Sequence, residues 1–218
     1  MPRKNRGYKK EGGHYKDATY KLIVGEGKAE EQYFNGLLPH IEEESRKRVK
    51  LKVFPYQDSK SALKHLVSKS MDFRAIVSDF EKGKDELWII ADKDLNSDSQ
   101  LMEAINHCQI EAFNLAISTP CFEIWLLLHL SDLTDTEHNI NPIFKGKPNR
   151  KAAQNCEKEL KKVLGGYNKA NIPMQQLIPH IQTAIERARE KETDHDWPRD
   201  IGTKVFKVIE KLNFKQPN

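Results

Sequence analysis

Two short runs of consecutive apolar residues, at positions 22–24 and 87–91, constrain the fold of this chain more than any other feature. A run without polar alternation is typical of a strand that is covered on both faces, as in the parallel sheets of α/β proteins. Helical periodicity follows the first run, with Tyr33, Phe34 and Leu37 on one stripe of residues 29–38. Strands that alternate with helices predict βαβ units and a mostly parallel, Rossmann-like sheet flanked by helices.

The same reasoning predicts the order of the elements along the first part of the chain. Strands are expected over residues 19–24, 51–56, 87–91 and 113–117. Helices are expected over residues 29–38, from Ser59 or Ser61 toward residue 80, from a cap at Ser97 or Asp98, and over residues 121–130. We therefore expect an α/β core over residues 19–130.

The second part of the chain has a different pattern. Residues 131–147 are polar and irregular, and helices are predicted over 150–164, 174–191 and 202–212. Residues 131–218 are thus expected to form a mainly helical C-terminal extension. The pattern leaves open whether this extension is a small separate lobe or a cover for one sheet face.

Charge and composition restrict the compartment and the partners. The net charge is only +4, but residues 1–18 form a basic, glycine-containing segment that we interpret as a flexible arm, suited to a nucleic-acid backbone or simply solvated. No apolar stretch approaches the roughly 20 residues that cross a bilayer. Three widely spaced cysteines do not form a disulfide framework. We expect a cytoplasmic protein with no membrane partner.

Acidic residues follow two of the predicted strands. Glu26 comes directly after the first, and Asp92 and Asp94 come directly after the third. Because parallel strands end at the same edge of a sheet, these carboxylates are expected to converge where α/β proteins bind ligands. Carboxylates gathered at one edge repel one another unless a cation such as Mg²⁺ lies between them. The alternatives are that Glu26 interacts with the following helix N-terminus and that the aspartates are turn formers.

Other charged residues are secondary candidates. Glu123 lies in an otherwise apolar segment, so it is either directed at the same edge or exposed on the helix. Lys28, Lys93 and Lys169 could neutralise charge on a reacting phosphate or be ordinary solvated lysines. Glu30, one turn into the first helix, is expected to be exposed.

Three segments resemble a known family. Residues 23–34, IVGEGKAEEQYF, resemble the opening motif of RloB-like proteins, with Ala29 where the family usually has Thr. The sequence Asp92-Lys93-Asp94 resembles their DxD motif. Residues 118–129, STPCFEIWLLLH, resemble their SNPCFE-x-W-LLLH segment, with Thr119 where the family usually has Asn. The three motifs occur in the family's order.

The resemblance implies a Toprim-type fold in which Glu26, Asp92 and Asp94, together with Glu123, bind Mg²⁺ or Mn²⁺. It also implies a nuclease that acts on DNA, RNA or tRNA as the effector of a bacterial antiviral defence system, beside a partner ATPase (RloA-like). Glu123 or Lys169 is expected to assist catalysis, and an oligomer is possible. The alternative functions are a non-catalytic module that binds the ATPase or nucleic acid, and phosphotransfer or hydrolysis on a small nucleotide.

Overall fold

The computed structural model describes residues 20–53, 62–77, 80–94, 96–134 and 150–214. The predicted basic arm, the start of the helix expected from Ser59 or Ser61, and most of the irregular segment after residue 131 lie outside these ranges. Among the described residues, no helix is long and apolar enough to cross a membrane.

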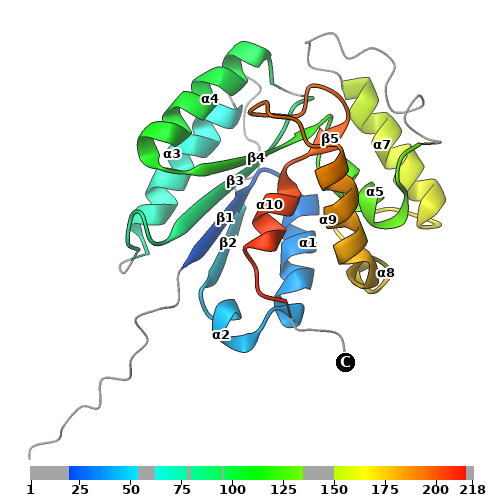
Figure 1. Cartoon of the computed structure of the whole chain (residues 1–218), viewed down its shortest axis with the longest axis horizontal. Coiled ribbons are helices and arrows are strands. Elements are labelled where there is room, and N and C mark those ends of the chain that lie inside the picture. Colours follow the sequence, from blue (N-terminus) through cyan, green and yellow to red (C-terminus); the bar gives the residue numbers. More distant parts are fainter. Residues whose placement is uncertain (1–19, 54–61, 78–79, 95, 135–149, 215–218) are drawn as a thin grey trace, which may run out of the picture.

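A five-stranded sheet forms the centre of the molecule (Figure 1). Its order is β2-β1-β3-β4-β5, with β1–β4 parallel and β5 antiparallel to β4. This is the predicted α/β, Rossmann-like architecture. The strands are β1 (Lys21–Gly25), β2 (Val49–Val53), β3 (Glu86–Asp92), β4 (Asn114–Thr119) and β5 (Gly202–Thr203).

Helices cover both faces of the sheet. On one face lie α3 (Ala62–Ala75) and α4 (Asp98–Glu111). The other face carries α1 (Lys28–Leu37), α5 (Glu123–Leu130), α7 (Arg150–Val163), α8 (Met174–Leu177), α9 (Ile181–Glu190) and α10 (Val205–Glu210). Short connecting helices are η1 (Leu38–His40), α2 (Glu43–Arg46) and η2 (Ile178–His180).

The apolar residues of the central strand β3 explain why both faces of the sheet are covered. Successive residues of a strand point to opposite faces. In β3, Leu87 and Ile89 pack with α3 and α4, whereas Trp88 and Ile90 pack on the other face. An uninterrupted apolar run therefore supplies two cores at once.

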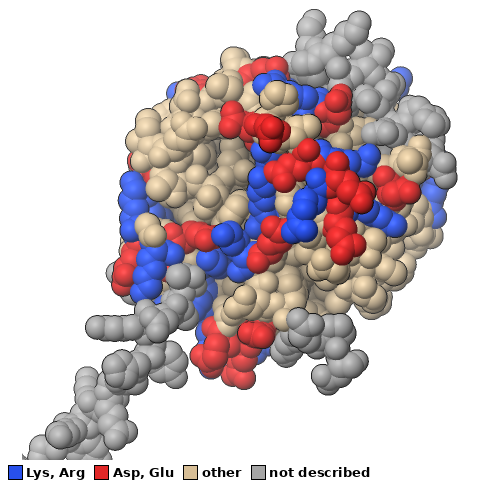
Figure 2. All heavy atoms as spheres, viewed as in Figure 1, with Lys and Arg blue, Asp and Glu red and all other residues tan. Residues whose placement is uncertain are grey.

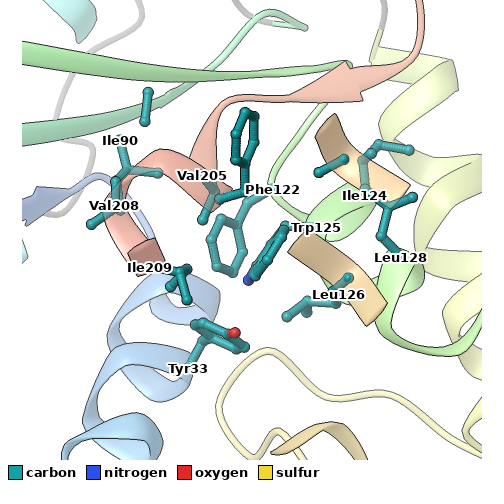
Figure 3. Packing of buried hydrophobic residues seen from close by; sticks show 14 of the residues in the cluster. Tyr33, Ile90, Phe122, Ile124, Trp125, Leu126, Leu128, Val205, Val208 and Ile209 are labelled. Carbon is teal, nitrogen blue, oxygen red and sulfur yellow. The ribbon is translucent and has the colours of Figure 1, made fainter. Parts of the chain in front are cut away.

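The larger core joins helices that are distant in the sequence. Figure 3 shows Val205, Val208 and Ile209 of α10 among Phe122, Trp125 and Tyr33. The Tyr33 ring lies edge-on to Phe122, with ring centroids 5.7 Å apart. The helices of residues 150–214 thus share a hydrophobic core with α1 and α5, so they cover one sheet face.

The C-terminal segment also completes the sheet, which the sequence pattern did not predict. The helix expected over residues 202–212 begins only at Val205, and Gly202 and Thr203 form β5. The Thr203 hydroxyl lies 2.8 Å from Ser118 Oγ and accepts a hydrogen bond from the Val205 backbone N–H. The helix expected over residues 174–191 is likewise divided into α8, η2 and α9, where Pro179 interrupts the regular backbone pattern.

Ser97 is the predicted cap of α4 and forms a complete capping box with Gln100. We expect Ser97→Ala to lower the free energy of unfolding by about 1 kcal/mol, because an N–H of the first turn loses its acceptor. Urea denaturation measures the change. Ser68→Ala, at an exposed position inside α3, is the matched control. An equal effect at both positions would show that the box contributes nothing.

On the face seen in Figure 2, basic and acidic side chains are interleaved. Ion pairs connect α10 to α9 and to the segment just after α9: Arg189 pairs with Glu210, and Lys207 pairs with Glu192. The described residues on this face therefore present no large field of one sign.

Candidate metal centre

The two central strands, β1 and β3, are neighbours whose connections leave in opposite directions. After β1 the chain passes through α1 to β2, and after β3 it passes through α4 to β4. The helices α1 and α4 lie on opposite faces of the sheet. Such a switch point, at the carboxyl ends of the strands, is where open α/β sheets bind ligands.

Acidic side chains occupy this switch point. Glu26 follows β1 directly, and Asp92 is the last residue of β3. Within the described ranges, Glu26 Oε1 and Asp92 Oδ1 are buried and have no hydrogen-bond partner. Buried carboxyl oxygens without a hydrogen-bond partner are costly in a folded protein, and a cation between them would compensate that cost.

The backbone of the DxD segment is fixed against the end of β4. The N–H of Lys93 donates to the Ser118 carbonyl, and the N–H of Asp94 donates to the Pro120 carbonyl, both over 2.9 Å. The Asn96 side chain donates to the Asp92 carbonyl over 2.7 Å. Asp94 is buried, and its charge acts on both Glu26 and Asp92. The predicted acidic cluster is thus held on rigid backbone.

Glu30 is a pocket residue, and the expectation that it would be exposed is wrong. It is only 4% exposed. Two glycines leave room for it: a Cβ on Gly25 would lie 3.0 Å from Glu30 Cβ, and a Cβ on Gly27 would lie 2.7 Å from Glu30 Oε2. Gly27 has an ordinary extended φ of −129°, so space requires the glycine there. Gly25 and Gly27 are therefore the feature of the sequence that could have indicated a buried Glu30.

Glu123 is directed at the same edge. Its side chain is 3% exposed, and its Oε1 lies 2.9 Å from Lys169 Nζ. Tyr167 donates its hydroxyl proton to the same oxygen over 3.1 Å. Lys169 also contacts Glu157 Oε1 at 2.8 Å. Tyr167 and Glu157 were not among the predicted site residues. No local sequence pattern marks Glu157, because its partner Lys169 reaches it only through the loop after α7.

The lysines of the two motifs lie in different surroundings. Lys28 is exposed beside the carboxylates. Lys93 is only 4% exposed, so it is not a solvated lysine. Its Nζ donates to the Asn96 carbonyl over 2.7 Å and lies 2.9 Å from Asp98 Oδ1. Lys93 therefore stabilises the turn between β3 and α4.

The carboxylates raise one another's pKa. Burial raises the pKa of Glu26 from 4.5 to about 8, and the charges of Glu30 and Asp94 add to the rise. Burial likewise raises the pKa of Glu30 to about 7, although its backbone hydrogen bond opposes the change. The pKa of Asp92 lies well above its usual range because of burial and the four neighbouring acids. The carboxyl groups of this site thus resist ionisation unless a cation compensates them.

These side chains enclose a pocket of about 170 Å³. Its charged lining consists of Glu26, Glu30, Asp92, Glu123, Lys28 and Lys169. Among the described residues, no three His, Cys, Asp or Glu side chains are close enough to surround one ion by themselves. Mg²⁺ is usually held by only one or two protein carboxylates, together with waters and substrate phosphate. The all-oxygen donors Glu26 and Asp92 therefore fit a hard divalent cation.

His129 belongs to the core beside this site, as a satisfied histidine. Its Nδ1 lies 2.9 Å from the Trp125 carbonyl oxygen, which can only accept, so Nδ1 carries the proton. Nε2 then accepts from the Tyr33 hydroxyl over 3.1 Å. Burial lowers the pKa of His129 to about 4, which keeps the ring neutral.

The motif segments that carry these residues lie within a match to one protein family. No curated protein and no solved structure matches the chain. The family model described as "RloB-like protein" matches residues 21–212, which include every strand and the whole acidic pocket. The chain therefore belongs to the RloB-like family.

Proposed function

We propose that this protein is a Mg²⁺-dependent nuclease of Toprim type that cleaves phosphodiester bonds of nucleic acid. The observation that carries the proposal is the pair of unpartnered buried oxygens, Glu26 Oε1 and Asp92 Oδ1, at the switch point of the sheet. Divalent ions bound by carboxylates at such an edge recruit phosphates.

The charged residues of the site fall into two groups in this proposal. Glu26 and Asp92 would hold the ion, with Asp94 beside them, and Mn²⁺ could replace Mg²⁺. A bound ion supplies Lewis-acid stabilisation of the charge on phosphoryl oxygens. Lys169 and Lys28 bring positive charge to the pocket, where an anionic substrate would otherwise meet only carboxylates. The backbone hydrogen bonds of the DxD segment would hold its aspartates in place when substrate binds.

A pocket that selects phosphate does not by itself select DNA or RNA. Purified protein should therefore be incubated with single-stranded DNA, double-stranded DNA, RNA and tRNA, each with Mg²⁺, with Mn²⁺ or with EDTA. We expect cleavage of at least one of these polymers with either ion and none with EDTA. Hydrolysis of free nucleotides alone would instead support the small-nucleotide alternative.

Membership of the RloB-like family supports the wider role implied by the motifs. We propose that the protein acts in the cytoplasm as the effector of an antiviral defence system with a partner ATPase. The cleavage assay should accordingly be repeated with that ATPase present. Binding to the ATPase without any cleavage, even in the assembled complex, would favour a non-catalytic module.

A further inference from the structure

The acidic pocket has two halves that differ in how their charge is compensated. On the strand side, Glu26 Oε1 and Asp92 Oδ1 have no partner within the described part of the chain. On the helix side, Glu123 Oε1 receives both the Lys169 ammonium group and the Tyr167 hydroxyl. A cation is thus already present beside Glu123.

The position of Lys169 is set by the fold of its loop. Gly165 and Gly166, with φ of 69° and 155°, turn the chain back after α7. Asn168 then fixes the next turn: its side-chain oxygen accepts from the Ala170 N–H, and its carbonyl accepts from the Asn171 N–H. The Lys169 ammonium lies between carboxylates of two helices, 2.9 Å from Glu123 and 2.8 Å from Glu157.

We propose that Lys169 takes the place of a second metal ion, so that the pocket binds one divalent cation, on Glu26 and Asp92. This inference rests on the proposed metal-dependent function and specifies its stoichiometry. A divalent ion on Glu123 would have to displace an ammonium group that has two carboxylate partners, and it would be repelled by that group. In this proposal Glu123 is the partner of Lys169. It is not the metal ligand that the family resemblance implies.

The test counts bound Mn²⁺ per chain by isothermal titration calorimetry at pH 8, with electron paramagnetic resonance of free Mn²⁺ as a second readout. We expect one ion on the wild-type protein and two on Lys169→Met, because that substitution leaves Glu123 and Glu157 without their ammonium. Lys161→Met, at an exposed position of α7, is the control and should bind one. Lys169→Arg keeps the charge and should also bind one.

A second variant separates the two roles of Glu123 even if Lys169→Met does not fold. Glu123→Gln should bind one Mn²⁺ with an affinity within about twofold of wild type, whereas loss of a true ligand would weaken binding by roughly tenfold or more. Two ions on the wild type, one ion on folded Lys169→Met, or weakened binding to Glu123→Gln would each overturn the inference. No Mn²⁺ on the wild type would overturn the metal-dependent function as well.

Discussion

Asp92→Asn is expected to reduce metal-dependent phosphodiester cleavage by roughly 10²–10⁴-fold. A metal ion contributes several kcal/mol of charge stabilisation in the transition state, and each 1.36 kcal/mol corresponds to a factor of ten in rate. Asp92 ends a central strand and lines the same pocket as Glu26, so the substitution replaces one of the two carboxylates proposed to hold the ion by a neutral amide, a weaker ligand for a hard cation. The measurement is the initial rate of cleavage of the polymer identified in the substrate survey.

The fold of Asp92→Asn should be intact, because the substitution removes a charge from a group of mutually repelling acids. The melting temperature of the metal-free variant is expected to equal or exceed that of the wild type. Asp72→Asn, at an exposed position of α3, makes the same chemical change away from the pocket and should leave the rate unchanged. A folded Asp92→Asn protein that cleaves as fast as wild type would remove Asp92 from the site.

The sheet was predictable because its signal is local. A run such as residues 87–91 can be satisfied only where both faces are covered, and the structure places alternate residues of β3 in two separate cores. The capping of α4 by Ser97 was equally readable from neighbouring residues. The strand order was not, because nothing within β1 or β3 specifies that they lie side by side.

The convergence of Glu26 and Asp92 followed from a general property of parallel sheets. Parallel strands share one carboxyl edge, so the strand ends had to gather the acids there even before the order was known. The surroundings of each acid were less accessible to prediction. The position of Glu30 in its helix, by itself, predicts an exposed side chain, whereas the space left by Gly25 and Gly27 admits it to the pocket.

Contacts between distant segments account for the remaining differences. β5 has only two residues, and its place depends on the pairing of Thr203 with Ser118, which no local pattern encodes. The sequence left open whether Lys93 compensates a phosphate or is solvated. It is buried instead, and Asp98 of α4 compensates its charge.

The metal-free protein is expected to lose stability as the pH rises from 6.5 to 8, and saturating Mg²⁺ should reverse the loss. In the unfolded chain the carboxyl groups of Glu26 and Glu30 are already ionised at pH 6.5, since their ordinary pKa is 4.5. In the folded protein burial raises these pKa values to about 8 and about 7. The native state therefore holds protons that the unfolded state has lost, and stability falls until the folded pKa is passed.

Between pH 6.5 and 8, the titration of other groups does not dominate the change in stability. His129 has a pKa of about 4 in the folded protein against 6.5 for the ordinary side chain, so its effect on stability lies below pH 6.5. One pKa unit corresponds to 1.36 kcal/mol, and about 1 kcal/mol shifts the melting temperature of a protein of this size by roughly 2–4 °C. We expect a fall of at least about 4 °C between pH 6.5 and 8 in EDTA.

Glu26→Gln provides the decisive comparison for this pH dependence. The amide has no proton to lose, so the fall in melting temperature should be smaller than in the wild type, and Mg²⁺ should stabilise the variant less at pH 8. Glu190→Gln, at an exposed position at the end of α9, should behave as the wild type. A wild-type melting temperature that is flat or rises over this range would mean that burial and mutual repulsion do not raise the pKa values of these acids. The argument for a cation between Glu26 and Asp92 would then lose its electrostatic basis.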